Sequence, residues 1–438
     1  MSKKGELMED TTKTVNQKDQ YAFSRFLYIL EAAFEYFISI LITGAFLAKV
    51  TTSIGISDGL TGVLTSFVSL GCGFQMIAIF LANKRPVKKW VTILHSLNQL
   101  FFALIYLVPF IQISATGKTV LFIGFLLLGH IINNVVNSPK INWFMSLVDD
   151  NKRGRFTANK EIVSLIGGMA FSFIVGIFID RFEAAGDTQS AFIFCGIAVF
   201  VLMLLHTYTL IASKEKPAET AEKTSVKATV GKLVKDKNLF KVILLSSFWT
   251  IAHSVATPFY GTYQVKELGF TMTFVSLLSA LYAICRSLFS KPLGRYADKR
   301  SFPRMLNICY IVAACAFAVQ TFTMPQNGKI FYTVYYMLYA VSMAGINSGE
   351  INLIYDFVDK ENRVSALALK STFAGFSGFF TTLAISPLVQ KIQTNGNTFF
   401  GIPVYAQQVV SAFAFLLVIG VLIYLNTVVN KIQTKREL

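Results

Sequence analysis

"NSPKINWFMSLVDDNKR" occupies residues 137–153, and "NSGEINLIYDFVDKENR" occupies residues 347–363. The second stretch repeats the first, so that Asn137 matches Asn347 and Arg153 matches Arg363. One exchange reverses a charge, because Lys140 in the first copy is Glu350 in the second. A long segment that recurs in this way predicts a chain built from two equivalent halves.

The composition places both copies in a membrane protein. Of the 438 residues, 54% are hydrophobic and 15% are charged, whereas soluble domains carry about 25% charged residues. The apolar stretches run near or beyond about 20 residues, which is the length that crosses a bilayer core. We therefore expect an all-α membrane protein. Because the sequence has no nucleotide-binding loop, metal-ligand cluster or nucleophile motif, we expect neither an enzyme nor a cofactor or metal.

Twelve apolar spans follow one another along the chain. They cover residues 23–48, 59–82, 90–113, 119–148, 161–180, 190–212, 241–263, 272–292, 305–323, 330–356, 371–388 and 405–428. They predict twelve transmembrane helices, six in each half. The expected organisation is an N-terminal tail at 1–22, a first half at 23–212, a polar linker at 213–240, a second half at 241–428 and a C-terminal tail at 429–438.

The basic residues cluster on one side of these spans. Both tails and the connections after every second span are rich in lysine and arginine, whereas each opposite connection carries one basic residue: Lys49, Lys118, Arg181, Lys266, Lys329 and Lys391. Cytoplasmic loops carry an excess of basic residues, so both termini and the linker are expected in the cytoplasm. This distribution also explains the net charge of +16 without any binding of nucleic acid.

A second repeated motif supports the two-half organisation. The connection after span eight reads "GRYADKRSFPR" over residues 294–304, and the connection after span two has Asn83 where this one has Asp298. Two parallel six-span repeats with such a loop resemble the major facilitator superfamily along nearly the whole chain. The resemblance implies two pseudo-symmetric halves around a central cavity lined by spans 1, 4, 7 and 10. It also implies a secondary transporter that works by alternating access.

The motif residues are candidates for gating. A glycine lets two helices approach closely, and an acidic residue at a helix end can pair with arginine or accept from a helix N-terminus. Such a contact can form in one state of a transporter and break in the other. The gating candidates are Gly294, Asp298, Lys299, Arg304, Asn83, Arg153 and Arg363.

Five ionisable residues lie well inside the predicted spans: Glu31, Glu35, Lys140, Arg286 and Glu350. A charge at a helix centre costs at least about 2.5 kcal/mol unless it faces water or a partner. Lys140 and Glu350 occupy equivalent depths, so we expect them to face each other across the central axis. They form either a structural ion pair or two unlike walls that hold a polar or zwitterionic solute. In a third alternative, each charge has a separate partner.

Glu31 and Glu35 are candidates for ion coupling. Four residues apart, they share one helix face, and two neighbouring carboxylates near mid-bilayer suit a proton-binding site. Arg286 lies at similar depth and joins them as a coupling candidate, or pairs with one of them in a structural role. His130 and His253, also deep in spans, are interpreted as packing residues.

The predicted cavity-lining spans carry polar and aromatic candidates for substrate binding, and aromatic faces with polar edges suit sugars. These candidates are Lys140, Glu350, Asn137, Asn142, Asn347, Asn352, Trp143, Trp249, Tyr260 and Tyr339. We expect a monomer in the bacterial inner membrane that takes up a polar organic solute, such as a sugar or glycoside, with H⁺ or another cation. The alternatives are proton-coupled efflux of hydrophobic compounds and a membrane receptor or scaffold.

Overall fold

The computed structural model describes residues 20–82, 86–149, 152–216, 226–359 and 362–432. Helices dominate these ranges, because backbone N–H and C=O groups inside a bilayer must bond within their own segment. The only strands in the described part of the chain are β1 (Thr398–Phe399) and β2 (Ile402–Pro403), which pair antiparallel. The predicted all-α class is confirmed. Parts of both tails and of the linker fall outside the described ranges.

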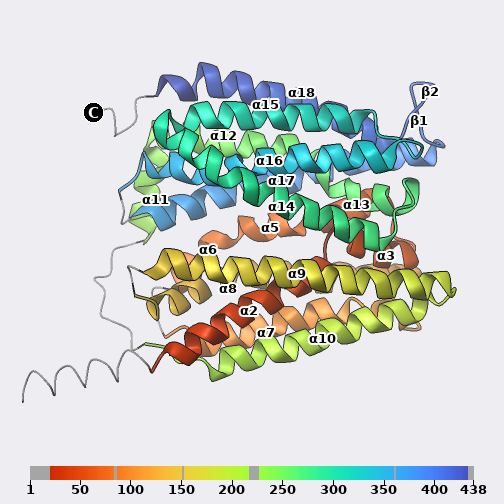
Figure 1. Ribbon diagram of the computed structural model, residues 1–438, viewed down its shortest axis with the longest axis horizontal. Coiled ribbons are helices and arrows are strands. Elements are labelled where there is room, and N and C mark those ends of the chain that lie inside the picture. Colours follow the sequence, from red (N-terminus) through yellow and green to blue (C-terminus); the bar gives the residue numbers. More distant parts are fainter. Residues whose placement is uncertain (1–19, 83–85, 150–151, 217–225, 360–361, 433–438) are drawn as a thin grey trace, which may run out of the picture.

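The helices of the first half pack against one another in one group (Figure 1). They are α2 (Ala22–Leu41), α3 (Gly44–Ser53), α4 (Asp58–Thr65), α5 (Phe67–Gly73), α6 (Gln75–Ala82), α7 (Lys88–Leu104), the 3-10 turn η1 (Val108–Phe110), α8 (Ala115–Ser146), α9 (Arg153–Ala184) and α10 (Thr188–Ala212). Predicted span one is broken, since α2 and α3 meet at an angle of 47°. Gly44 opens α3 with a φ of 55°, a conformation that glycine adopts without strain.

The helices of the second half form the other group. They are α11 (Val226–Lys235), α12 (Lys237–Ser254), the 3-10 turn η3 (Thr257–Phe259), α13 (Tyr260–Thr262), the π-helical turn η4 (Tyr263–Glu267), α14 (Met272–Lys299), α15 (Phe302–Thr321), α16 (Gly328–Tyr355), α17 (Arg363–Thr394), α18 (Ala406–Thr427) and η6 (Val429–Lys431). Predicted span seven is interrupted at η3, where Pro258 lies within the turn. The breaks in spans one and seven occupy corresponding places in the two halves, a pattern that points to a binding site between them.

The helices are consistent with twelve membrane spans, although fewer than twelve of them meet a test of length and apolar composition. Nine helices of the described residues are long and apolar enough to cross a membrane, or ten if α2 and α3 form one span. Two further predicted spans correspond to α7 and α16. The first has only 17 residues and carries His95, Asn98 and Gln99, and the second carries Glu350 and several tyrosines.

Two sides of the molecule can be distinguished in Figure 1. We call the side where α2 begins, α11 lies and α18 ends the linker side, and the side that carries β1 and β2 the hairpin side. The halves meet tightly at the hairpin side. A Cβ atom on Gly261 would lie 2.5 Å from the carbonyl oxygen of Gly44, and one on Gly176 would lie 2.9 Å from that of Met272. Only glycine permits contacts this close between helices of the two halves.

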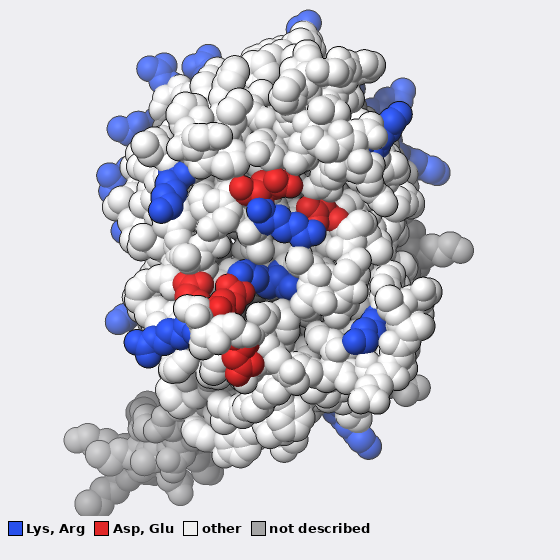
Figure 2. Space-filling model, turned by 90° about the vertical axis from the view of Figure 1, so that its right-hand side faces the viewer, with Lys and Arg blue, Asp and Glu red and all other residues white. Residues whose placement is uncertain are grey.

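Polar contacts also join the halves at the hairpin side. Asp58, at the start of α4, forms an ion pair with Lys266 and accepts a hydrogen bond of 2.6 Å from Nε2 of Gln393. The carboxylate of Asp180 accepts from the backbone N–H groups of Met272 and Thr273 at 2.7 and 2.8 Å, and so caps α14. Figure 2 looks onto this side, where acidic and basic side chains lie next to one another near the centre of the face.

The 294–304 motif differs from the expected loop. Helix α14 continues to Lys299, so Gly294 and Asp298 lie within a helix. Among the described residues, no atom outside the backbone of α14 itself lies within 4 Å of the place that a Cβ on Gly294 would take, so these residues do not form the expected close approach of two helices there. Arg304 lies in the first turn of α15, where its backbone N–H points to Oγ of Ser301 at 3.4 Å. Asn83 lies outside the described residues.

Candidate functional site

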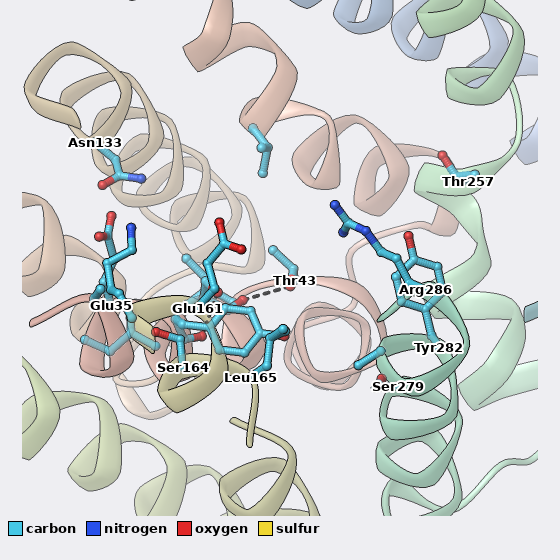
Figure 3. A pocket seen from close by; sticks show the side chains of 18 of the residues that line it. Glu35, Thr43, Asn133, Glu161, Ser164, Leu165, Thr257, Ser279, Tyr282 and Arg286 are labelled. Carbon is cyan, nitrogen blue, oxygen red and sulfur yellow. Dashed lines mark hydrogen bonds between the residues drawn. The ribbon is translucent and has the colours of Figure 1, made fainter. Parts of the chain in front are cut away.

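A cavity of about 1010 Å³ lies between the two halves (Figure 3). Thr43 and Thr257, at the breaks in spans one and seven, line its end nearer the hairpin side. From there it extends toward the linker side as far as Glu161 on α9 and Ser290 on α14. The two broken spans therefore meet at the cavity, as their corresponding positions indicate.

The two walls of the cavity differ in chemistry. Its first-half wall is polar and carries charges of both signs, with Glu35, Glu161 and Lys160 beside Gln99, Asn133 and Asn134. The second-half wall is aromatic and basic, with Tyr282, Tyr335, Tyr336, Tyr339 and Arg286. In Figure 3, Glu35 and Glu161 lie on one side of the space, and Arg286 and Tyr282 lie on the other.

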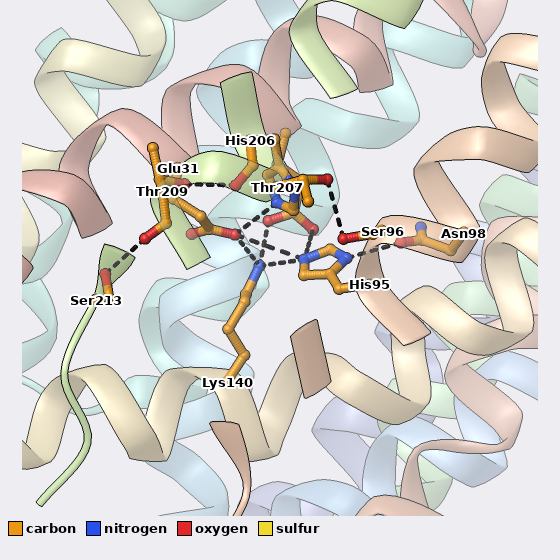
Figure 4. A network of polar contacts seen from close by, with 10 residues as sticks. Glu31, His95, Ser96, Asn98, Lys140, His206, Thr207, Thr209 and Ser213 are labelled. Atoms are coloured by element: carbon orange, nitrogen blue, oxygen red, sulfur yellow. Dashed lines mark hydrogen bonds and ion pairs between the residues drawn. The ribbon is translucent and has the colours of Figure 1, made fainter. Parts of the chain in front are cut away.

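A buried cluster of charges lies directly behind the first-half wall (Figure 4). At its centre is Lys140 of α8, whose side chain is 2% exposed. Its Nζ lies 2.8 Å from Oε1 of Glu31 and forms a second ion pair with Glu35, both on α2. Nζ also lies 2.9 Å from Nε2 of His95 on α7. Helices α8 and α2 thus deliver one ammonium and two carboxylates to a single buried point, and α7 adds the imidazole of His95.

The hydrogen-bond partners indicate the state of the two histidines. Nδ1 of His95 lies 2.7 Å from Oδ1 of Asn98. With that nitrogen donating to the amide oxygen, Nε2 accepts from the ammonium of Lys140, and the ring is neutral. Nε2 of His206, on α10, lies 3.0 Å from Oε1 of Glu31 and donates to it. Nε2 of His95 also lies 3.5 Å from Oε1 of Glu31. With both rings neutral, the two carboxylates and one ammonium leave the cluster with one uncompensated negative charge.

This arrangement has room for one more proton or cation. Oε2 of Glu31 and Nδ1 of His206 are buried and have no hydrogen-bond partner among the described residues. Glu31, Glu35, His95 and His206 offer ligand atoms that all lie within 4.8 Å of one another, and the ammonium of Lys140 already serves as the cation of this set. Glu35 is 22% exposed and lines the cavity, so it connects the buried cluster with the transport path.

The structure does not bring Lys140 and Glu350 together. Glu350, on α16, accepts a hydrogen bond of 3.0 Å from the hydroxyl of Tyr310 and pairs with Nζ of Lys370 at 2.8 Å. All three residues belong to the second half, just as the partners of Lys140 belong to the first. Each charge of the repeated segment is therefore neutralised within its own half, which corresponds to the third alternative. The walls of the cavity remain unlike, but through other residues: Glu35, Glu161 and Lys160 on the first half, and Arg286 with tyrosines on the second.

Among the ten predicted substrate-binding residues, Tyr339 alone is part of the cavity lining that the described residues form. Helix α8 contributes Asn133 and Asn134 to the cavity lining. The repeated segment begins after these residues, at position 137. Residues away from the cavity lining are Asn137, Asn142, Asn347 and Asn352, together with Lys140 and Glu350.

The other aromatic candidates have structural partners. Trp143 stacks on Phe144 and donates from Nε1 to the carbonyl oxygen of Lys214 at 2.9 Å. Trp249 packs against Tyr310, and the hydroxyl of Tyr260 bonds to Oγ of Ser411 at 2.7 Å. These three side chains are buried, so they hold helices together and do not face the cavity.

Of the coupling candidates, Glu35 and Arg286 line the cavity and Glu31 lies behind it. No described carboxylate forms an ion pair with Arg286. Two gating candidates, Arg153 and Arg363, begin α9 and α17, and the guanidinium of Arg363 lies 4.5 Å above the ring of Tyr355.

Interpretation of the sequence missed His95 and His206. For His95, the sequence of α7 contained an indication: His95, Asn98 and Gln99 follow helical spacing and so share one face. All three are buried. A polar face within an apolar span indicates a buried polar network rather than lipid contact. His206 has no comparable pattern around it, and only the packing of α10 on α2 and α7 reveals its role.

Comparisons with known proteins agree with this architecture. The chain matches the Major Facilitator Superfamily over residues 27–382, while no curated protein shows significant sequence similarity to it. Among solved structures, it resembles a D-xylose–proton symporter (TM-score 0.68, 14% identity, 92% of this chain and 97% of that one). It also resembles the nucleoside transporter NupG (TM-score 0.67, 14% identity, 95% and 100%).

An autoinhibited peptide transporter of the POT family has a similar fold (TM-score 0.68, 12% identity, 95% of this chain and 98% of that one). At these identities the likeness concerns the fold. The family match, however, covers residues 27–382, which include the buried cluster, the residues that line the cavity and all but the end of the second half. The chain belongs to the Major Facilitator Superfamily.

Proposed function

We propose that this membrane transporter takes up a polar organic solute together with protons, by alternating access. The observation that carries the proposal is the buried cluster around Lys140, which has one uncompensated negative charge and reaches the cavity through Glu35. A site that binds a proton beside a solute cavity couples the two if their binding changes the same conformational equilibrium.

The charges outside the bundle support an orientation. Basic residues such as Lys88, Lys89, Lys232 and Arg300 lie on the linker side, and cytoplasmic segments carry such an excess. With the linker side in the cytoplasm, the contacts at the hairpin side close the transporter to the outside. The cavity, which extends toward the linker side, then faces the cytoplasm.

The cluster provides a means of coupling. In the present arrangement Lys140 pairs with both Glu31 and Glu35, so both carboxylates are ionised. A proton on Glu35 removes its charge and with it one of the two ion pairs between α2 and α8, while the pair of Glu31 with Lys140 remains. The protonated cluster keeps one carboxylate and one ammonium, and its net charge is zero. Proton binding thereby loosens a contact between two cavity-lining helices.

The cavity suits a polar solute better than a hydrophobic one. Its volume of about 1010 Å³ is ample for a sugar or glycoside, since small-molecule sites typically occupy about 300–1,000 Å³. Glutamates and asparagines on one wall accept and donate hydrogen bonds, and tyrosines on the other present flat faces to a sugar ring. Efflux of hydrophobic compounds requires a wall with fewer charges than Glu35, Glu161 and Arg286 supply.

The coupling role of Glu35 can be tested in proteoliposomes with an imposed pH gradient. We expect Glu35→Gln to abolish accumulation against the gradient while exchange of solute across the membrane continues, because the variant cannot exchange the coupling proton. A matched control is Glu183→Gln, which removes a carboxylate paired with Lys49 outside the cavity. Accumulation by the Glu35→Gln variant at the level of the control would contradict the proposal.

A further inference from the structure

We infer that the transported solute is a sugar acid, whose carboxylate binds to Arg286 and whose hydroxyl groups reach the acidic wall opposite. The inference rests on the proposed function in one respect, namely that the cavity between the halves is the solute site. It is independent of which ion drives transport.

Arg286 is the centre of the argument. It lies near the middle of α14, thirteen residues before Lys299, and its side chain lines the cavity. A cation at this depth in a membrane protein faces water or a partner, and no described carboxylate pairs with it. The guanidinium group presents a planar fork of N–H donors that matches a carboxylate in two parallel hydrogen bonds. An incoming carboxylate therefore supplies what the site lacks.

The residues beside Arg286 favour a ring. In Figure 3, Tyr282 and Ser279 lie on the same helix as Arg286 and face the same space. Tyr336 and Tyr339 of α16 complete this wall. Their faces accommodate the apolar face of a pyranose, and their hydroxyls can bond to its substituents. A short aliphatic acid would leave this surface uncovered.

The opposite wall favours hydroxyl groups. Glu161 and Asn133 point into the cavity from α9 and α8 (Figure 3), and a carboxylate is an acceptor only. Sugar hydroxyls donate to such acceptors without bringing a second negative charge near them. A polyanion would bring further negative charge close to Glu35 and Glu161, with Lys160 as the one cation among the described lining residues of that wall.

Other solute classes fit less well. A neutral sugar leaves the guanidinium without a counter-charge, a hydrophobic compound leaves both charged walls without partners, and a metal cation is repelled by Arg286. Arg286 could instead serve as a gate that pairs with Glu161 when α9 and α14, which pack together, change their contact. A gate of this kind does not require a charged solute, so an experiment can distinguish the gating role of Arg286 from its role in binding a carboxylate.

The experiment measures binding to the purified full-length protein with matched pairs of probes: glucuronate with glucose, galacturonate with galactose, and gluconate with sorbitol. Isothermal titration calorimetry and thermal shift are the readouts. We expect at least one acid to bind and its neutral partner to bind at least about tenfold more weakly, since hydrogen bonds to charged groups contribute roughly 10- to 100-fold in affinity.

Variants locate the effect. Arg286→Gln should remove the preference for the acid, with a loss of about 10- to 100-fold in its affinity, and Arg286→Lys should restore part of it because the charge is kept. Arg300→Gln, at the end of α14 outside the cavity lining, is the matched control and should bind normally. A thermal midpoint like that of the native chain shows that each variant is folded.

Two binding results would overturn the inference: no acid binds more tightly than its neutral partner, or the preference survives Arg286→Gln. Rescue of neutral-solute transport in Arg286→Glu by Glu161→Arg would also overturn it and assign Arg286 to a gate. Failure of the proton-coupling proposal can be distinguished from failure of this inference. If only the coupling proposal is wrong, Glu35→Gln accumulates solute while the preference for acids still depends on Arg286.

Discussion

At the scale of single residues, the charge reversal between Lys140 and Glu350 has a local meaning. Lys140 is held by Glu31, Glu35 and His95, and Glu350 by Tyr310 and Lys370. The sequence predicted that both charges are buried, because hydropathy alone requires it. It could not predict their partners, because a partner depends on how neighbouring helices are rotated and packed.

This arrangement predicts the outcome of a charge exchange. Lys140→Glu and Glu350→Lys should each destabilise the protein by about 3–5 kcal/mol, as expected when a buried pair loses one partner. The double exchange should lower the free energy of unfolding by about the sum of the two single effects, because the two new charges do not contact each other and each lies beside charges of its own sign.

Unfolding in detergent, followed by far-UV circular dichroism, gives the coupling energy of this double-mutant cycle, which should lie near zero. A double variant more stable than either single variant would show that the two residues do interact across the axis.

At the scale of elements, helix existence and order followed from apolar runs, whereas breaks and ends did not. Each of the twelve predicted spans overlaps helical structure. The bend between α2 and α3, however, depends on the positive φ of Gly44, and α14 extends to Lys299 although its last turns are polar. Polar residues end a membrane span without ending the helix, so hydropathy places the boundary too early.

The glycine contacts at the hairpin side should set the balance between conformations. Gly261→Ala places a methyl group against the carbonyl oxygen of Gly44, so the closed hairpin side becomes less stable and the outward-facing state more populated. In a chain whose five cysteines are replaced, a cysteine at Ser279 in the cavity should then react at least about threefold faster with an impermeant thiol reagent applied at the hairpin side, as a change of about 0.7 kcal/mol implies.

Gly294→Ala is the matched control, because no neighbouring group in the described part of the chain lies within 4 Å of the added methyl group. Equal labelling in both variants would mean that the glycine contact does not hold this side closed.

At the scale of the whole molecule, the repeat, the polar linker and the basic asymmetry predicted two halves with a cavity between them. The sequence could not predict which charges line each wall of the cavity, because this depends on which charged residues form ion pairs within their own half. Orientation follows from the basic residues and remains a prediction with a direct test.

Cysteines replacing Lys216 on the linker side and Lys329 at the start of α16, both exposed, distinguish the two orientations. Labelling of intact cells with an impermeant reagent should modify the cysteine at position 329 and spare the one at position 216. The reverse pattern would place the linker outside the cell.

The self-contained neutralisation of each half has an electrical consequence. Because neither Lys140 nor Glu350 has a partner in the other half, rocking of the halves leaves the ion pairs of both residues intact, and the ion pair that it separates is that of Asp58 with Lys266 at the hairpin side. A charge that crosses the whole membrane exchanges about 2.3 kcal/mol with a potential of 100 mV. The protonated cluster is neutral, whereas the empty one keeps one negative charge. We therefore expect the membrane potential to act mainly on the return of the empty transporter, and pre-steady-state currents recorded without solute should reveal this step. Currents confined to the solute-loaded transition would show that the bound solute, and not the cluster, moves charge through the field.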